Sequence, residues 1–64
     1  MNIKAERLNR GLSLVAAAEA MSVPTTVLHR AERGEGNPHP GNAKKIADFY
    51  GVAVTDIWPV EVTA

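Results

Sequence analysis

"SVPTTVLHRAERG", residues 22–34, is a turn followed by a predicted helix that ends at Gly34. On a helical wheel, Leu28 and Ala31 fall on one side of this helix. The opposite side carries hydroxyls, an imidazole and two guanidinium groups, with no acid among them: Thr25 (at the border), Thr26, His29, Arg30 and Arg33. The stretch therefore predicts a short helix with one buried face and one polar, basic face.

A second short helix comes directly before this turn. Residues 14–21 are apolar apart from Glu19 and rich in alanine, and Ser13 is a suitable N-cap. Because only about three residues join the two helices, they must cross steeply, which is the helix-turn-helix arrangement. We expect small and branched side chains to form their buried contact: Ala17, Ala18, Met21, Val23, Leu28 and Ala31.

The predicted fold class is all-α, a compact bundle of five short helices. We expect these helices at residues 3–10, 14–21, 24–33, 43–50 and 55–58. One apolar stripe marks the fourth helix: Ala43, Ile46, Ala47 and Tyr50. Asn42 is its expected N-cap, and Gly51 its expected left-handed end. Residues 1–58 should form one domain, with 59–64 as a short C-terminal tail.

Composition excludes several classes of protein. A chain of 64 residues buries only about 60% of its unfolded surface, and it has no cysteine and two isolated histidines. We therefore expect no disulfide, no metal and no cofactor. The polar start and the lack of a long apolar run predict a cytoplasmic protein without a membrane partner. Net charge is zero, but residues 1–34 hold five Lys/Arg against three Glu, which allows a modest positive patch.

The basic face of residues 24–33 suits the major groove of DNA. Arginine can bind guanine through two hydrogen bonds, and threonine can contact thymine through its hydroxyl or its methyl group. A recognition helix presents its N-terminal turn to base edges, and Thr25 and Thr26 lie in that turn. The alternative interpretation is an ordinary solvated helix face, and the wheel alone favours neither.

From Ile3 to Trp58 the chain resembles the lambda-repressor-like (Xre/Cro) helix-turn-helix domains of phage and bacterial regulators. The resemblance has no gap and rests on the joint spacing of many positions. They are Ile3, Arg7, "GLS" at 11–13, Ala17, Ala18, Val23, Leu28, "ERG" at 32–34, Pro38, "IADFYGV" at 46–52 and Ile57. It implies a small sequence-specific regulator that binds double-stranded operator DNA, similar to a phage repressor, a Cro-type protein, an excision factor or an antitoxin-like regulator.

The resemblance also implies roles for individual residues. Base edges would be contacted by Thr25, Thr26 and Arg30, with His29 at the margin of this set. Backbone phosphates would be contacted by Ser13, Arg33, Asn37 and His39. Arg7 and Glu32 match a pair that is a structural ion pair in the family.

Several positions depart from the family's pattern and favour weaker DNA binding. Leu14 replaces a polar residue, often glutamine, that contacts the DNA backbone and supports the recognition helix. Ser22 replaces a left-handed turn glycine, and Pro24 replaces a capping serine or threonine, each at a cost of about 1 kcal/mol. Glu35 introduces an acid where basic residues are common.

No enzymatic site is expected. "GEGNPHPG", residues 34–41, has glycines near the spacing of a phosphate-binding loop, but it lacks the preceding strand and the lysine of that motif. The predicted helices position no catalytic triad or carboxylate pair, and a bundle of this size has no room for a closed pocket.

The C-terminal segment "DIWPVEVTA", residues 56–64, leaves two interpretations open. In one, Trp58 closes the bundle against the first helix. In the other, Trp58, Val60 and Val62 form an apolar strip that joins two copies or binds a protein partner. A homodimer would place a second recognition helix about 34 Å away, in the next turn of the groove. The alternative function is thus a protein-interaction module that retains the helix-turn-helix fold.

Overall fold

The computed structural model describes residues 1–35 and 38–58, which contain five helices and no strand. The helices are α1 (Ile3–Asn9), α2 (Leu14–Met21), α3 (Thr25–Arg33), α4 (Pro40–Tyr50) and α5 (Val54–Ile57). The predicted all-α bundle is therefore confirmed. Asn37, Val60 and Val62, to which the sequence assigned contacts, lie outside the described residues.

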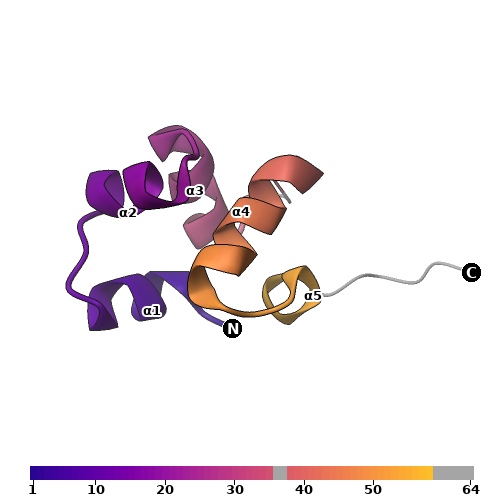
Figure 1. Cartoon of the computed structure of the whole chain (residues 1–64), viewed down its shortest axis with the longest axis horizontal. Coiled ribbons are helices and arrows are strands. Elements are labelled where there is room, and N and C mark those ends of the chain that lie inside the picture. The colour runs from indigo at the N-terminus through magenta and orange to yellow at the C-terminus, as the bar shows by residue number, and fades with distance from the viewer. Residues whose placement is uncertain (36–37, 59–64) are drawn as a thin grey trace, which may run out of the picture.

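The helices α2 and α3 form the predicted helix-turn-helix pair (Figure 1). All six side chains expected at their contact are buried: Ala17, Ala18, Met21, Val23, Leu28 and Ala31. The turn between the helices passes through Ser22, whose φ of 59° is left-handed, a conformation that costs a non-glycine residue about 1 kcal/mol. Hydrogen bonds hold this turn: the Ser22 N–H donates to the Glu19 carbonyl (3.1 Å), the Val23 N–H to the Ala18 carbonyl (3.0 Å), and Lys45 Nζ to the Ser22 carbonyl (3.3 Å).

The helix starts confirm one predicted cap and correct another. Ser13 Oγ accepts the Ala16 N–H at 3.1 Å, as expected for the N-cap of α2. The predicted N-cap at Asn42 is wrong, because α4 begins at Pro40 and its N-cap is His39. Proline suits a first helical position, since its φ is already helical and its missing N–H would have no partner there. His39 Nδ1 accepts the Gly41 N–H at 3.1 Å and completes this start.

The helix α4 forms the centre of the bundle and leads to α5 (Figure 1). Its predicted apolar stripe is buried: Ala43, Ile46, Ala47 and Tyr50. Gly51 ends the helix with a left-handed φ of 70°, as expected. The last helix starts one residue earlier than predicted, and Asp56 Oδ2 accepts the Ala53 N–H at 3.1 Å near its positive end.

Arg10 joins the end of α1 to the end of α4. Its guanidinium carbon lies 5.4 Å from the centre of the Phe49 ring and 5.0 Å from that of Tyr50. Its Nη1 also donates to the Phe49 carbonyl at 3.1 Å. This cation therefore contributes to packing of the bundle through cation–π contacts and a helix-end hydrogen bond.

Candidate nucleic-acid interface

The outer side of α3 is an exposed ridge of polar and basic side chains. Thr26, His29, Arg30 and Arg33 are exposed, and Thr25, at the border of the wheel arc, is half-buried. Leu28 and Ala31 hold the opposite side of the helix in the core. The side chains of Thr26, His29 and Arg30 make no hydrogen bond or ion pair with residues 1–35 or 38–58. They are thus available to an external partner.

A groove runs along each side of this ridge. The groove towards α1 has a volume of about 420 Å³ and is lined by Lys4, Arg7, Leu14, His29, Glu32 and Arg33. The groove towards the start of α4 has a volume of about 240 Å³ and is lined by Val27, Arg30, Ala31, Glu35, Pro38, His39 and Asn42. The ridge of α3 therefore projects between two hollows. A helix must project in this way if it enters a groove between the two strands of a nucleic acid.

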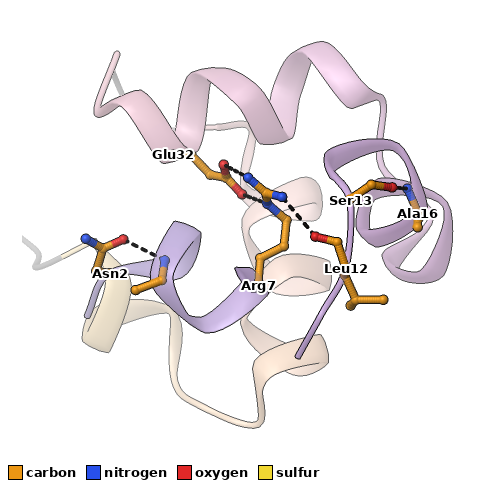
Figure 2. A network of polar contacts seen from close by, with 7 residues as sticks. Asn2, Arg7, Leu12, Ser13, Ala16 and Glu32 are labelled. Atoms are coloured by element: carbon orange, nitrogen blue, oxygen red, sulfur yellow. Dashed lines mark hydrogen bonds and ion pairs between the residues drawn. The ribbon is translucent and has the colours of Figure 1, made fainter. Parts of the chain in front are cut away.

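The predicted ion pair between Arg7 and Glu32 is confirmed and forms the floor of the first groove. Arg7 Nε and Nη2 donate to the two Glu32 carboxylate oxygens at 2.7 and 3.1 Å, and Nη1 donates to the Leu12 carbonyl at 2.9 Å (Figure 2). The hydrogen bond to Glu32 raises the pKa of Arg7 above its usual value. The side chains are 9% and 3% exposed, so this contact fixes α1 to α3 rather than offering either charge to a ligand.

The other cations divide into structural and free groups. Lys44 Nζ lies 3.0 Å from Asp48 Oδ2, while Lys45 and Arg10 bind the backbone carbonyls described above. Arg33 Nε lies 3.4 Å from Glu35 Oε2, with both side chains more than half exposed. Within the described part of the chain, only Lys4 and Arg30 have cationic side chains without a hydrogen bond or ion pair; Arg30 lies on α3 and Lys4 lines the groove beside it.

The sequence-predicted phosphate contacts are only partly brought together. Arg33 lines the groove towards α1, and His39 lines the groove towards α4. Ser13 is exposed, but its hydroxyl is the cap of α2, and His39 uses Nδ1 as the cap of α4, which leaves Nε2 as its outer polar atom. Asn37 lies outside the described residues.

Sequence reasoning missed Lys4. The first helix was predicted only as a range, residues 3–10, and Lys4 was assigned no role, yet Lys4 lines the same groove as His29 and Arg33. The available signal was its spacing from Arg7, since residues three apart on a helix share a face. Once Arg7 is paired with Glu32 of the third helix, that spacing brings Lys4 towards the same helix.

Trp58 supports the closing interpretation of the C-terminal segment. It is half-buried and packs against the core. It also lines a shallow hollow of about 500 Å³ together with Met1, Asn2, Ile3, Ala31, Glu32, Gly34 and Ile57. The indole therefore lies beside the start of α1 and the end of α3.

A family model described as helix-turn-helix matches residues 3–57, nearly the whole chain. The chain belongs to the lambda-repressor-like helix-turn-helix family. This is a family of DNA-binding regulatory domains and not a class of enzyme. Neither a curated protein nor a solved structure matches the chain. In the described residues of this helix-turn-helix protein, no helix is long and apolar enough to cross a membrane.

Proposed function

We propose that the chain is a small regulator of transcription, of repressor or Cro type, that binds operator DNA sequence-specifically with α3 in the major groove. The observation that carries this proposal is the exposed, acid-free ridge of α3. An α-helix with its side chains is about 10–12 Å across, and the major groove is about 12 Å wide. The ridge is therefore presented on an element of the right width.

In this proposal Arg30 is the principal base-reading residue. Its side chain is exposed and has no partner in the described chain, and its guanidinium can bind the O6 and N7 atoms of guanine together. Thr25 and Thr26 lie in the first turn of α3, where base edges are closest, and His29 reads from the margin of the ridge. Thr25 is half-buried, so mainly the outward-facing atoms of its side chain are available to contact a base.

Pro24, which replaces the family's usual capping serine or threonine, favours the contact of α3 with DNA. Proline is the N-cap of α3 and supplies no side-chain hydrogen bond, so the first-turn N–H groups of Thr25 and Thr26 have no partner in the described residues. Uncapped N–H groups at the positive end of a helix bind anions. The lower stability at this cap is thus offset when α3 approaches a phosphate or a base acceptor.

The test is selection of binding sites from a random pool of duplex DNA, followed by anisotropy titration of the selected duplexes at several salt concentrations. We expect a short motif, and an affinity that falls as salt rises, because bound phosphates release counterions. A scrambled duplex of the same composition is the control. Equal affinity for the selected and scrambled duplexes would contradict sequence-specific recognition.

A second candidate function is suggested by the hollow beside Trp58, where apolar side chains adjoin the polar residues Asn2 and Glu32. Met1 is 47% exposed at its rim, and Ile57 and Trp58 are half-buried in it. We infer from this that the C-terminal end of the domain pairs two copies or binds a protein partner; Val60 and Val62, which the sequence assigns to the same surface, lie outside the described residues. A pair of copies would also explain how so small a ridge reads a full operator, because each copy supplies one half-site.

Sedimentation of the protein with and without the selected duplex tests this second candidate. Pairing predicts two copies per duplex and a palindromic motif whose half-sites lie about 34 Å apart. Val62→Asp should then reduce the complex to one copy, whereas Lys44→Gln, on the exposed side of α4, should leave it unchanged. One copy on a non-palindromic site would exclude pairing as the means of recognition.

A further inference from the structure

The groove between α1 and α3 has a distinct charge pattern. Lys4, His29 and Arg33 line it, and its single acid, Glu32, is neutralised by two nitrogens of Arg7. Glu32 is also hidden, with its side chain only 3% exposed. Any group that enters this groove therefore meets cations and an imidazole at the surface, while the negative charge stays below them.

We propose that this groove is a binding site for a backbone phosphate of the DNA, and that Lys4 of α1 is its central contact. The inference rests on the proposed function, in which α3 lies in the major groove. A helix in that groove has a sugar–phosphate strand on each side, so the hollows flanking α3 are where the strands run. Lys4 projects from a different helix than the base-reading residues and contacts the strand on the α1 side.

Leu14 takes a role in this site that differs from the one usual in the family. It is half-buried, packs against the core and lines the groove. A leucine cannot hydrogen-bond a phosphate, but it provides an apolar wall against which a deoxyribose can rest. Lys4, one helix away, thereby supplies the phosphate interaction that a polar side chain at position 14 would otherwise make.

The opposite groove is poorer in positive charge. Its described lining contains no lysine, its arginine is Arg30, which is assigned to the bases, and it includes the acid Glu35. His39 is its remaining titratable group, with one ring nitrogen already used as a cap. The two DNA strands should consequently be held unequally, with the larger electrostatic share on the α1 side.

The test compares Lys4→Gln with Lys44→Gln on selected and scrambled duplexes, by anisotropy over a range of salt. Both lysines are exposed, but Lys44 lies on α4 and pairs only with Asp48. Removing one phosphate-binding cation should weaken binding about fivefold to tenfold at 0.1 M salt and reduce the salt slope by about 1. Because a phosphate contact carries no sequence information, the loss of affinity should be the same on both duplexes. Lys4→Arg should restore binding, and Lys44→Gln should bind as wild type.

The outcomes separate this inference from the proposed function. If wild type selects a motif but Lys4→Gln binds with unchanged affinity and salt slope, the site is wrong and the proposed function stands. If wild type prefers no sequence while Lys4→Gln lowers general DNA affinity, the phosphate site stands and sequence-specific recognition is wrong. A loss confined to the selected duplex would make Lys4 a base contact and overturn the proposal. Thermal melting of each variant checks that the fold is retained, and a loss of fold that Lys4→Arg does not repair would also overturn it.

Discussion

Two arginine–glutamate pairs involve α3, a buried one that joins it to α1 and an exposed one at its C-terminal end, and the two pairs have different consequences. On the inner side, Arg7 and Glu32 share two hydrogen bonds and are 9% and 3% exposed. On the outer side, Arg33 and Glu35 approach to 3.4 Å and are 62% and 53% exposed. The inner pair fixes α1 against α3, whereas the outer pair is weak enough for a phosphate to take the place of Glu35.

Existing contacts, more than residue type, thus decide which cations of this small domain can bind a ligand. Arg7 and Arg10 are committed to packing, Lys44 is paired with Asp48 on α4, and Lys45 binds the Ser22 carbonyl in the turn between α2 and α3. The net charge of the chain is zero, but there is a local surplus of positive charge at α3. These committed cations lie in the interior or on other elements, whereas the unpaired cations of the described chain lie on or beside α3. Substitutions in each pair test its role separately, through stability for the inner pair and DNA affinity for the outer pair.

The largest effect is expected at the inner pair. Arg7→Ala leaves the Glu32 carboxylate buried without a partner, so the free energy of unfolding should fall by about 3–5 kcal/mol. Urea denaturation followed by circular dichroism measures this fall. The double variant Arg7→Met, Glu32→Leu should regain most of it, because no buried charge remains. A fall below about 1 kcal/mol for Arg7→Ala would show that Glu32 reaches water.

An intermediate effect is expected on the ridge. Arg30→Ala should weaken binding to the selected duplex by about 1–3 kcal/mol and relax one position of the motif, because alanine cannot hydrogen-bond guanine. Stability should change little, since Arg30 is exposed. Titration against a set of single-base variants measures both effects, and Lys44→Ala is the control. Equal weakening on every sequence would reassign Arg30 to a phosphate.

A smaller effect of opposite sign is expected at the outer pair. Glu35→Gln frees Arg33 and removes a charge that repels phosphate, so DNA affinity should rise about threefold at low salt. Raising the salt concentration should reduce this gain. Anisotropy titration of wild type and variant on one duplex provides the comparison. Weaker binding by Glu35→Gln would mean that Glu35 instead positions Arg33 for its contact.

The smallest effect is expected at Tyr50, a buried polar side chain that lacks the kind of partner Arg7 has. Its hydroxyl has no hydrogen bond in the described residues, so Tyr50→Phe should keep the free energy of unfolding at pH 7 within about 0.5 kcal/mol. Burial raises the pKa of Tyr50, so the unfolded chain ionises first. The associated stability is complete below about pH 10 and is lost as pH rises from there towards the folded-state pKa.

Urea midpoints of wild type and Tyr50→Phe between about pH 7 and 11 measure this difference. The two proteins should agree at neutral pH, and the variant should differ from wild type only once the tyrosine of the unfolded chain ionises. A large loss of stability at neutral pH would reveal a hydrogen bond of the hydroxyl that links it to the inner pair.

The sequence predicted most of what depends on local spacing. The packing of α2 on α3, the stripe of α4 and the cap at Ser13 follow from helical periodicity and side-chain chemistry, and all are present. The pairing of Arg7 with Glu32 came from the family resemblance, since 25 residues separate the partners. No periodicity within one helix could supply that contact.

The errors have equally physical causes. The N-cap of α4 was placed at Asn42 because its side chain suits the role, but Pro40 starts the helix earlier. Lys4 was overlooked because its importance arises only where α1 meets α3, which is a property of the packed bundle. The free cations thus became identifiable only after the structural ones had been assigned.

The position of Trp58 gives the protein a built-in optical probe. It is the single tryptophan of the chain, and its indole is half-buried where α5 meets the start of α1 and the end of α3. Its emission therefore reports the attachment of α5, while circular dichroism is dominated by the four longer helices. An emission change at a lower urea concentration than the loss of helicity would identify α5 as a latch that opens before the rest of the bundle unfolds.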